Sequence, residues 1–166
     1  MPQRTRLRPL QPPLRSRHAG VLAAMVLGLT GTTLMAQTRA MSPAVFFQTA
    51  QFRMAEMVRE GCEAAGGSMP EGVFVRDLDG DGATDLILSH DGLRCNGSRQ
   101  RSGFCGAQVC ETRIYLDRQG RLEQVASGYM TVLGISETET PPSITVYPHG
   151  GPQNRIRWDG SRFSER

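Results

Sequence analysis

Downstream of residue 42, the hydrophobic positions repeat with the period of an α-helix. Ser42 is a residue type that caps helices, and Pro43 is favoured at the first helical position. Polar side chains separate the hydrophobic ones, and Gly66 with Gly67 ends the repeat. The hydrophobic positions are Phe46, Ala50, Met54, Met57, Val58, Cys62 and Ala65. The pattern predicts one amphipathic helix over residues 43–65 whose hydrophobic side covers a core.

Beyond residue 70, the pattern changes to short apolar segments separated by turn-forming residues, which is typical of β-strands. We expect strands at residues 72–76, 86–89, 109–116, 122–126, 129–135, 143–147 and 155–158. Residues 93–108 form the one long polar loop. A single helix followed by short strands predicts an α+β fold, in which this N-terminal helix packs on a small antiparallel sheet or a partly closed barrel.

The first 36 residues differ in composition from the rest of the chain. They carry five arginines and no acidic residue, followed by the apolar run 21–29 and the small residue Ala36. This order is that of a secretory signal peptide, so we expect residues 1–36 to be cleaved and residues 37–166 to form a single domain. The alternative is an uncleaved membrane anchor, which needs roughly 20 predominantly apolar residues. Gly28 and several threonines interrupt the apolar run.

Cleavage of the signal peptide would change the net charge of the chain. The whole chain has 19 basic and 16 acidic residues, but cleavage removes five arginines and leaves 14 basic against 16 acidic residues, a formal charge of −2. The composition of the mature domain therefore gives no reason to expect a nucleic-acid partner. We expect a periplasmic or secreted bacterial protein with no membrane attachment after cleavage.

The same expectation of export indicates the oxidation state of the four cysteines. In an oxidising environment an even number of cysteines favours two disulfides over free thiols or a zinc site. The cysteines are Cys62, Cys95, Cys105 and Cys110; no C-x-x-C spacing occurs, and neither His90 nor His149 has a ligand spacing. Four cysteines allow three connectivities, and their spacing does not choose among them.

The segment DLDGDGATD, residues 77–85, places four carboxylates close together between two predicted strands. They belong to Asp77, Asp79, Asp81 and Asp85 at relative positions 1, 3, 5 and 9, with Gly82 at position 6 and the backbone carbonyl of Ala83 at position 7. This spacing matches the first part of an EF-hand loop, and hard oxygen ligands favour Ca²⁺. Leu88 stands where an EF-hand has its bidentate glutamate, so a helix-loop-helix EF-hand is excluded. The alternative is a solvated hairpin turn without metal.

The same segment resembles the D-x-D-G-D-G-x-x-D loop of FG-GAP and VCBS-type modules, where it lies between two β-strands and holds calcium. The resemblance implies that the carboxylates of Asp77, Asp79, Asp81 and Asp85 and the carbonyl of Ala83 are ligands. Propeller-forming members carry several copies, because a blade needs neighbours to bury its faces. This chain has one copy. The propeller's ligand-binding function therefore does not carry over to it.

A second resemblance is to uncharacterised secreted bacterial proteins that combine one such loop with a C-G-x-x-x-C segment and a W-D-G-x-x-F ending. Residues 105–110 and 158–163 match these two segments. The resemblance implies a Cys105–Cys110 disulfide, which leaves Cys62 to bond Cys95.

The sequence contains no recognised catalytic motif: no G-x-S-x-G, H-E-x-x-H or phosphate-binding loop. We therefore expect a non-enzymatic, calcium-stabilised structural or interaction module whose partner is an envelope protein or a glycan. The alternatives are a periplasmic inhibitor of an envelope hydrolase and a small envelope hydrolase. A hydrolase would need His90 or His149 in a concave pocket beside a carboxylate or a serine.

Overall fold

One α-helix, α1 (Pro43–Cys62), forms within residues 40–98 and 100–165, the part of the chain that the computed structural model describes. The predicted signal peptide, residues 1–36, lies outside this part. The side-chain oxygen of Ser42 accepts a hydrogen bond from the backbone N–H of Val45 at 3.4 Å, and Pro43 is the first helical residue. A short 3-10 turn, η1 (Glu63–Ala65), follows the helix. The helical segment predicted over residues 43–65 is therefore confirmed.

The strands are antiparallel. They are β1 (Gly67–Ser68), β2 (Val73–Arg76), β3 (Asp85–Ser89), β4 (Arg94–Cys95), β5 (Glu111–Asp117), β6 (Leu122–Ile135), β7 (Ser143–Pro148), β8 (Asn154–Trp158) and β9 (Phe163–Glu165). A second 3-10 turn, η2 (His90–Gly92), follows β3. Seven strands form one sheet in the order β2-β3-β5-β6-β7-β8-β9, and β1 pairs with β4. The fold is α+β as predicted, but its helix begins at Pro43 and is therefore not at the N-terminus of the chain. Because β2 and β9 are both edges of this sheet, the described strands form an open sheet and no closed barrel.

Strand β6 corrects the predicted strand boundaries. Two strands are expected at residues 122–126 and 129–135, with Ser127 and Gly128 between them, but the structure has one strand of 14 residues. The backbone continues because Ser127 pairs with Arg113 and Gly128 pairs with Thr112 across the neighbouring strand β5. The small residues Ser127 and Gly128 interrupt the apolar pattern of the sequence but not the strand.

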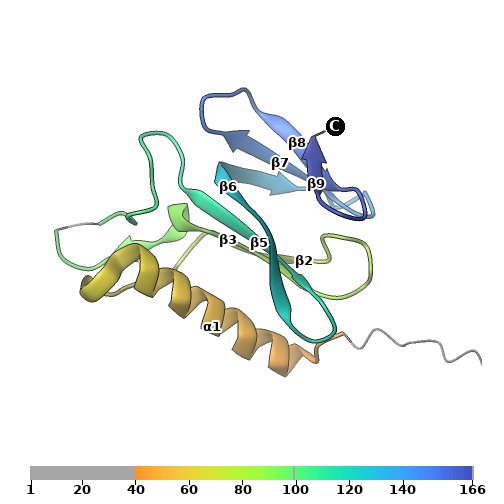
Figure 1. Cartoon of the computed structure of the whole chain (residues 1–166), viewed down its shortest axis with the longest axis horizontal. Helices are drawn as coiled ribbons and strands as arrows, with labels where there is room; N and C mark the ends of the chain where they lie inside the picture. Colours follow the sequence, from red (N-terminus) through yellow and green to blue (C-terminus); the bar gives the residue numbers. More distant parts are fainter. Residues whose placement is uncertain (1–39, 99, 166) are drawn as a thin grey trace, which may run out of the picture. The chain divides into compact units, whose positions relative to one another are not determined.

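The sheet folds over itself at β6, so the protein has three layers (Figure 1). The first part of β6 pairs with β5, and the last part pairs with β7. Strands β7, β8 and β9 pack over one face of β3 and β5, while α1 covers the other face. Strand β3 lies between these layers, and all five of its residues are buried.

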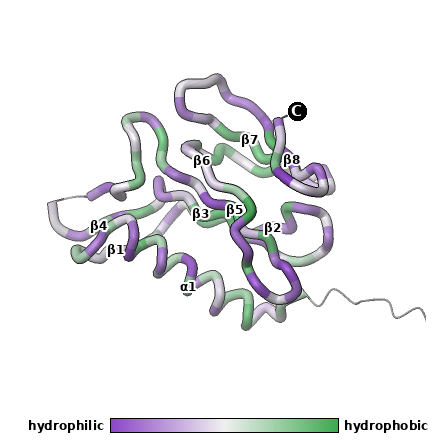
Figure 2. Tube along the Cα trace, viewed as in Figure 1, coloured by the Kyte–Doolittle hydropathy of each residue, from purple (hydrophilic) through white to green (hydrophobic). Residues whose placement is uncertain are grey.

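Two hydrophobic clusters fill the spaces between the layers. The helix-side cluster contains Phe46, Ala50, Met57, Leu86, Leu88 and Tyr115 among others, and the opposite cluster contains Leu78, Ile87, Ile114, Leu116, Ile144 and Val146. Figure 2 shows hydrophobic stretches along α1, β7 and the centre of the sheet. Burying each valine, leucine, isoleucine, phenylalanine or methionine side chain among them contributes about 1.5–3 kcal/mol. The strand that follows the aspartate loop is thus anchored in both parts of the core.

Two disulfides tie the long loop to this core. Cys62, at the end of α1, bonds Cys95 in β4, and Cys105 bonds Cys110 within the loop that leads to β5. This is the pairing that the second resemblance implies. Disulfides persist in oxidising compartments. No helix among the described residues is long and apolar enough to cross a membrane.

Candidate functional site

The aspartate loop connects two paired strands. Strands β2 and β3 are antiparallel neighbours, and Arg76 pairs with Asp85 where the loop begins and ends. Gly80 and Gly82 have φ values of 82° and 86°, a backbone conformation that glycine adopts without steric cost. The loop, residues 77–84, therefore connects the two strands of a β-hairpin, and its flanking strands distinguish it from an EF-hand with its flanking helices.

Three of the four carboxylates converge. Asp77, Asp79 and Asp85 each offer one oxygen, and these oxygens all lie within 4.8 Å of one another. Ca²⁺ binds oxygen ligands at about 2.3–2.6 Å, so oxygens that share one ion lie up to about 5 Å apart. The three carboxylates thus fit one calcium-sized cation.

Backbone N–H groups hold these carboxylates in place. The two oxygens of Asp77 accept hydrogen bonds from the N–H groups of Gly80 at 2.7 Å and Gly82 at 2.9 Å. Asp79 accepts one from the N–H of Asp81 at 3.2 Å. These bonds fold the loop inward whether or not an ion is present, so by themselves they are equally compatible with a metal-free turn.

Asp85 lies deepest in the cluster. It is the first residue of β3 and is buried, with its oxygens accepting hydrogen bonds from the N–H of Leu78 at 2.7 Å and of Asp117 at 2.8 Å. Burial raises the pKa of its carboxyl to about 7, and the charges of Asp79 and Asp81 add to this effect. A bound cation would offset the same repulsion and favour the ionised carboxylate.

The remaining two predicted ligands lie differently. Asp81 is not a member of the converging group; its Oδ1 accepts a hydrogen bond from the N–H of Ala83 at 2.7 Å. Burial raises the pKa of the Asp81 carboxyl, and the neighbouring Asp79 and Asp77 add to this. Ala83 is buried. The structure brings together three of the four predicted carboxylates and leaves the fourth, that of Asp81, outside this group.

Arg118 is a member of this site that the sequence did not reveal. It lies in the turn between β5 and β6, and its Nη1 is 2.6 Å from Oδ2 of Asp79 and 3.9 Å from Oδ2 of Asp81. Its guanidinium also lies 5.4 Å from the ring centre of Trp158. The segment 117–120 is recognisable as a turn, but only the strand pairing places it beside residues 77–85.

His90 occupies a second polar cluster, at the other end of β3. Its buried Nδ1 lies 2.8 Å from Oγ of Ser102, and its Nε2 lies 3.6 Å from Oε2 of Glu111. Arg113 ion-pairs with Glu111 at 3.0 Å and with Glu60 of α1 at 2.7 Å. Burial, followed by the charge of Arg113, lowers the pKa of His90 to about 4.

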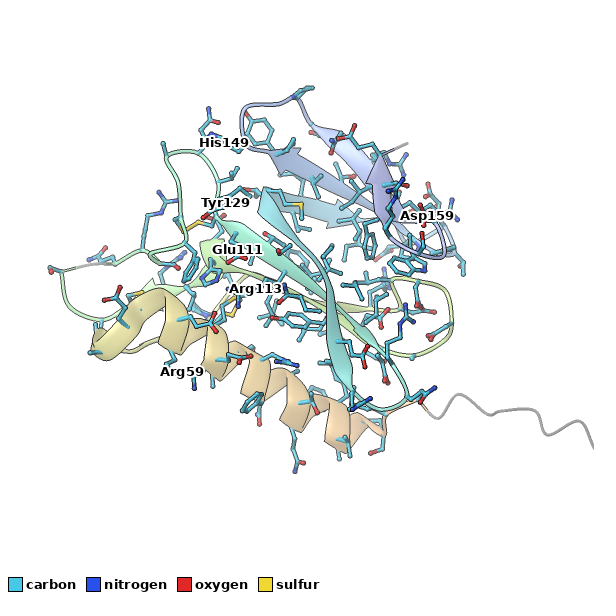
Figure 3. All side chains as sticks on the ribbon, viewed as in Figure 1. Arg59, Glu111, Arg113, Tyr129, His149 and Asp159 are labelled. Atoms are coloured by element: carbon cyan, nitrogen blue, oxygen red, sulfur yellow. A yellow bond between two sulfur atoms is a disulfide. The ribbon has the colours of Figure 1, made fainter. Side chains whose placement is uncertain are left out.

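A serine, a histidine and a carboxylate in contact invite comparison with a hydrolase triad. However, Ser102 is only 5% exposed, and its oxygen accepts a hydrogen bond from the N–H of Phe104 at 3.1 Å. A Cβ placed on Gly61 of α1 would lie 2.5 Å from that same oxygen, so the helix backbone closes the remaining side. No acyl group can approach a hydroxyl enclosed in this way, because the nucleophile and a substrate carbonyl must come within about 3–3.5 Å. His149, in contrast, lies exposed in the turn after β7 (Figure 3).

Comparisons with known proteins give no further information about this site. No family model matches the chain, and neither a curated protein nor a solved structure matches it.

Proposed function

We propose that this protein is an exported, non-enzymatic module in which Ca²⁺ binds the β2–β3 loop and stabilises the fold. The observation that carries the proposal is the convergence of the Asp77, Asp79 and Asp85 oxygens to within 4.8 Å of one another. The resemblance of residues 77–85 to the calcium loop of FG-GAP and VCBS-type modules supports it from the sequence.

Calcium is favoured over other metals by the donor set. Every donor in the cluster is oxygen, which suits Ca²⁺ and Mg²⁺ better than zinc or copper. Mg²⁺ requires a tight octahedral shell at about 2.0–2.1 Å, whereas Ca²⁺ accepts irregular shells of longer bonds. An irregular loop closed by backbone hydrogen bonds therefore favours Ca²⁺.

The position of Asp85 would couple such an ion to the core. Asp85 begins β3, which lies between α1 and the β7–β9 layer, and its carboxylate also holds the N–H of Asp117 at the end of β5. An ion on Asp85 would thus fasten two hairpins at once. A ligand that binds only the folded state stabilises it by RT ln(1 + [L]/Kd), about 2.7 kcal/mol at a hundredfold excess over Kd.

Thermal unfolding of the full-length protein tests this proposal. Extracellular calcium sites often bind at about 0.1–1 mM, so Tm should rise by several degrees between EDTA and about 10 mM Ca²⁺. The same concentration of Mg²⁺ should produce a much smaller rise. An identical Tm in EDTA, Ca²⁺ and Mg²⁺ would contradict the proposal and show that the loop is a solvated turn without metal.

The non-enzymatic part of the proposal rests on the His90 cluster. Its serine and histidine are enclosed by α1 and the loop, which favours a structural role for both.

We propose that the long loop around Arg94 and Arg101 is the surface that binds an envelope protein or glycan. The side chains of both arginines are exposed, and the two disulfides flank the loop. Capture experiments with envelope extract in Ca²⁺, using the reduced protein as control, test that surface.

Localisation is part of the same proposal. Disulfides favour an oxidising compartment, and a cleaved signal peptide would deliver the chain there. Intact mass of the exported protein should place its N-terminus between residues 37 and 41. A mass that retains residues 21–29 would indicate an anchor instead.

A further inference from the structure

We propose that the guanidinium of Arg118 is a built-in competitor for the cation site, so that Ca²⁺ must displace an internal positive charge in order to bind. This inference rests on the proposed calcium function. It assigns Arg118 the task of setting the calcium concentration at which the loop is filled.

Arg118 already pairs with a carboxylate of the proposed cation site. Arg118 Nη1 lies 2.6 Å from Oδ2 of Asp79, one of the three converging carboxylates. The Asp79 side chain is only 4% exposed, so its charge is poorly solvated and requires a nearby cation. The guanidinium of Arg118 supplies this positive charge, so a Ca²⁺ ion that binds Asp79 has to replace the ion pair between Arg118 and Asp79.

The turn between β5 and β6 holds the backbone of Arg118 close to the site. Asp117 Oδ1 accepts a hydrogen bond from the N–H of Gly120 at 2.7 Å, and the N–H of Asp117 donates to Asp85 at 2.8 Å. The turn that carries the arginine is therefore fixed to a carboxylate of the cluster. These bonds keep the backbone of Arg118 beside the loop, while its side chain is free to turn from Asp79 when an ion binds.

The guanidinium of Arg118 has a second partner, the indole ring of Trp158, which it can keep when Asp79 binds an ion. Its guanidinium lies 5.4 Å from the ring centre of Trp158, within the range of a cation–π contact. Transfer of Asp79 to the ion would change how this guanidinium sits on the indole. Trp158 is the single tryptophan of the chain, so its emission reports the exchange directly.

Calcium titration of the full-length protein, followed by calorimetry, tests the proposal with two matched variants. Arg118→Gln removes the competing charge. Arg121→Gln removes an equal charge from an exposed arginine of the same turn, which lies 3.6 Å from Glu123. Even with the screening of bulk water, a unit charge about 5 Å from a divalent ion changes the affinity for that ion by about tenfold or more. We expect Arg118→Gln to bind Ca²⁺ about tenfold more tightly than wild type and Arg121→Gln to stay within about twofold.

The outcomes separate the inference from the function on which it rests. Equal or weaker binding by Arg118→Gln, with wild type still binding, overturns the competitor role and leaves the calcium function standing. Binding by Arg118→Gln alone supports the competitor role and contradicts calcium binding by the native protein. No heat from either protein overturns both.

Trp158 emission gives a second measurement that does not require the variant to fold. In wild type, saturating Ca²⁺ should change the emission on excitation of tryptophan, at the same concentrations at which calorimetry detects binding. An unchanged emission at saturation would show that Arg118 does not leave its place, and this overturns the proposal.

Discussion

The hydroxyl oxygen of Ser102 lies 2.8 Å from Nδ1 of His90 in the interior of the protein. The same oxygen accepts the N–H of Phe104, and the direction of its bond to Nδ1 depends on which ring nitrogen carries the proton. Nε2 faces Glu111 at 3.6 Å and has no hydrogen-bond partner among the described residues. Burial lowers the pKa of His90 to about 4, so the imidazole is neutral at pH 7 and holds the long loop against α1.

The first prediction concerns pH. The pKa of His90 falls from 6.5 to about 4 on folding, so between these values the unfolded chain binds the proton more readily. The stabilisation by neutral His90 is complete above about pH 6.5 and is lost as pH falls towards 4. We expect the free energy of unfolding of wild type, relative to His90→Gln, to fall by about 2 kcal/mol between pH 7 and 4.5.

Urea unfolding at both pH values measures this difference. The comparison with His90→Gln cancels the other titrating groups, including Asp85. The exposed His149 provides the control, since His149→Gln should follow wild type. Parallel pH curves for wild type and His90→Gln would show that the buried imidazole does not govern acid stability.

The second prediction concerns Gly61, whose lack of a side chain leaves space for the side chains of His90 and Ser102. A Cβ at this position would lie 2.5 Å from Oγ of Ser102 and 2.9 Å from Nδ1 of His90. Gly61→Ala gains up to about 1 kcal/mol of helix propensity but forces the loop outward, and overpacking costs typically 1–3 kcal/mol. We expect a net loss of stability in thermal or urea unfolding. Gly134→Ala, whose Cβ would meet nothing within 4 Å, is the matched control and should be close to neutral.

The third prediction concerns the disulfides. The Cys62–Cys95 bond spans 33 residues and the Cys105–Cys110 bond spans 5. In the loop-entropy model their removal costs about 4 and about 2 kcal/mol respectively. The double variants Cys62→Ser/Cys95→Ser and Cys105→Ser/Cys110→Ser should therefore lose stability in that order. The reverse order would mean that packing around Cys110 outweighs the entropy of the unfolded chain.

The fourth prediction separates the aspartates. Asp77→Asn removes charge from a converging carboxylate, whereas Asp81→Asn removes the same charge from a carboxylate outside the converging group. Calcium affinity should therefore fall about tenfold or more for Asp77→Asn and clearly less for Asp81→Asn. Calorimetric titration measures both. Equal losses would indicate that Asp81 rotates into the shell when the ion binds.

The fold class and the aspartate loop were predictable because their signals are local. Helical spacing before Gly66 and short apolar segments after Gly72 depend only on near neighbours along the chain. The polar contacts at both ends of β3 join distant residues. Arg118 lies 39 residues beyond Asp79, and Ser102 lies 12 beyond His90. These partners become recognisable only when the strand order β3-β5-β6 places a turn and a loop beside them.

Strand β6 has a consequence for how the protein loses its structure. Residues 122–129 pair with β5 and residues 130–135 pair with β7, so one uninterrupted backbone belongs to both layers of the sheet. If β7, β8 and β9 came away, Ile87 and Leu116 would lose their cover and half of β6 would lose its partner. Neither layer has a stable existence without the other. The described domain should therefore melt in a single cooperative transition, with the emission of Trp158 and the far-ultraviolet circular dichroism reporting the same midpoint.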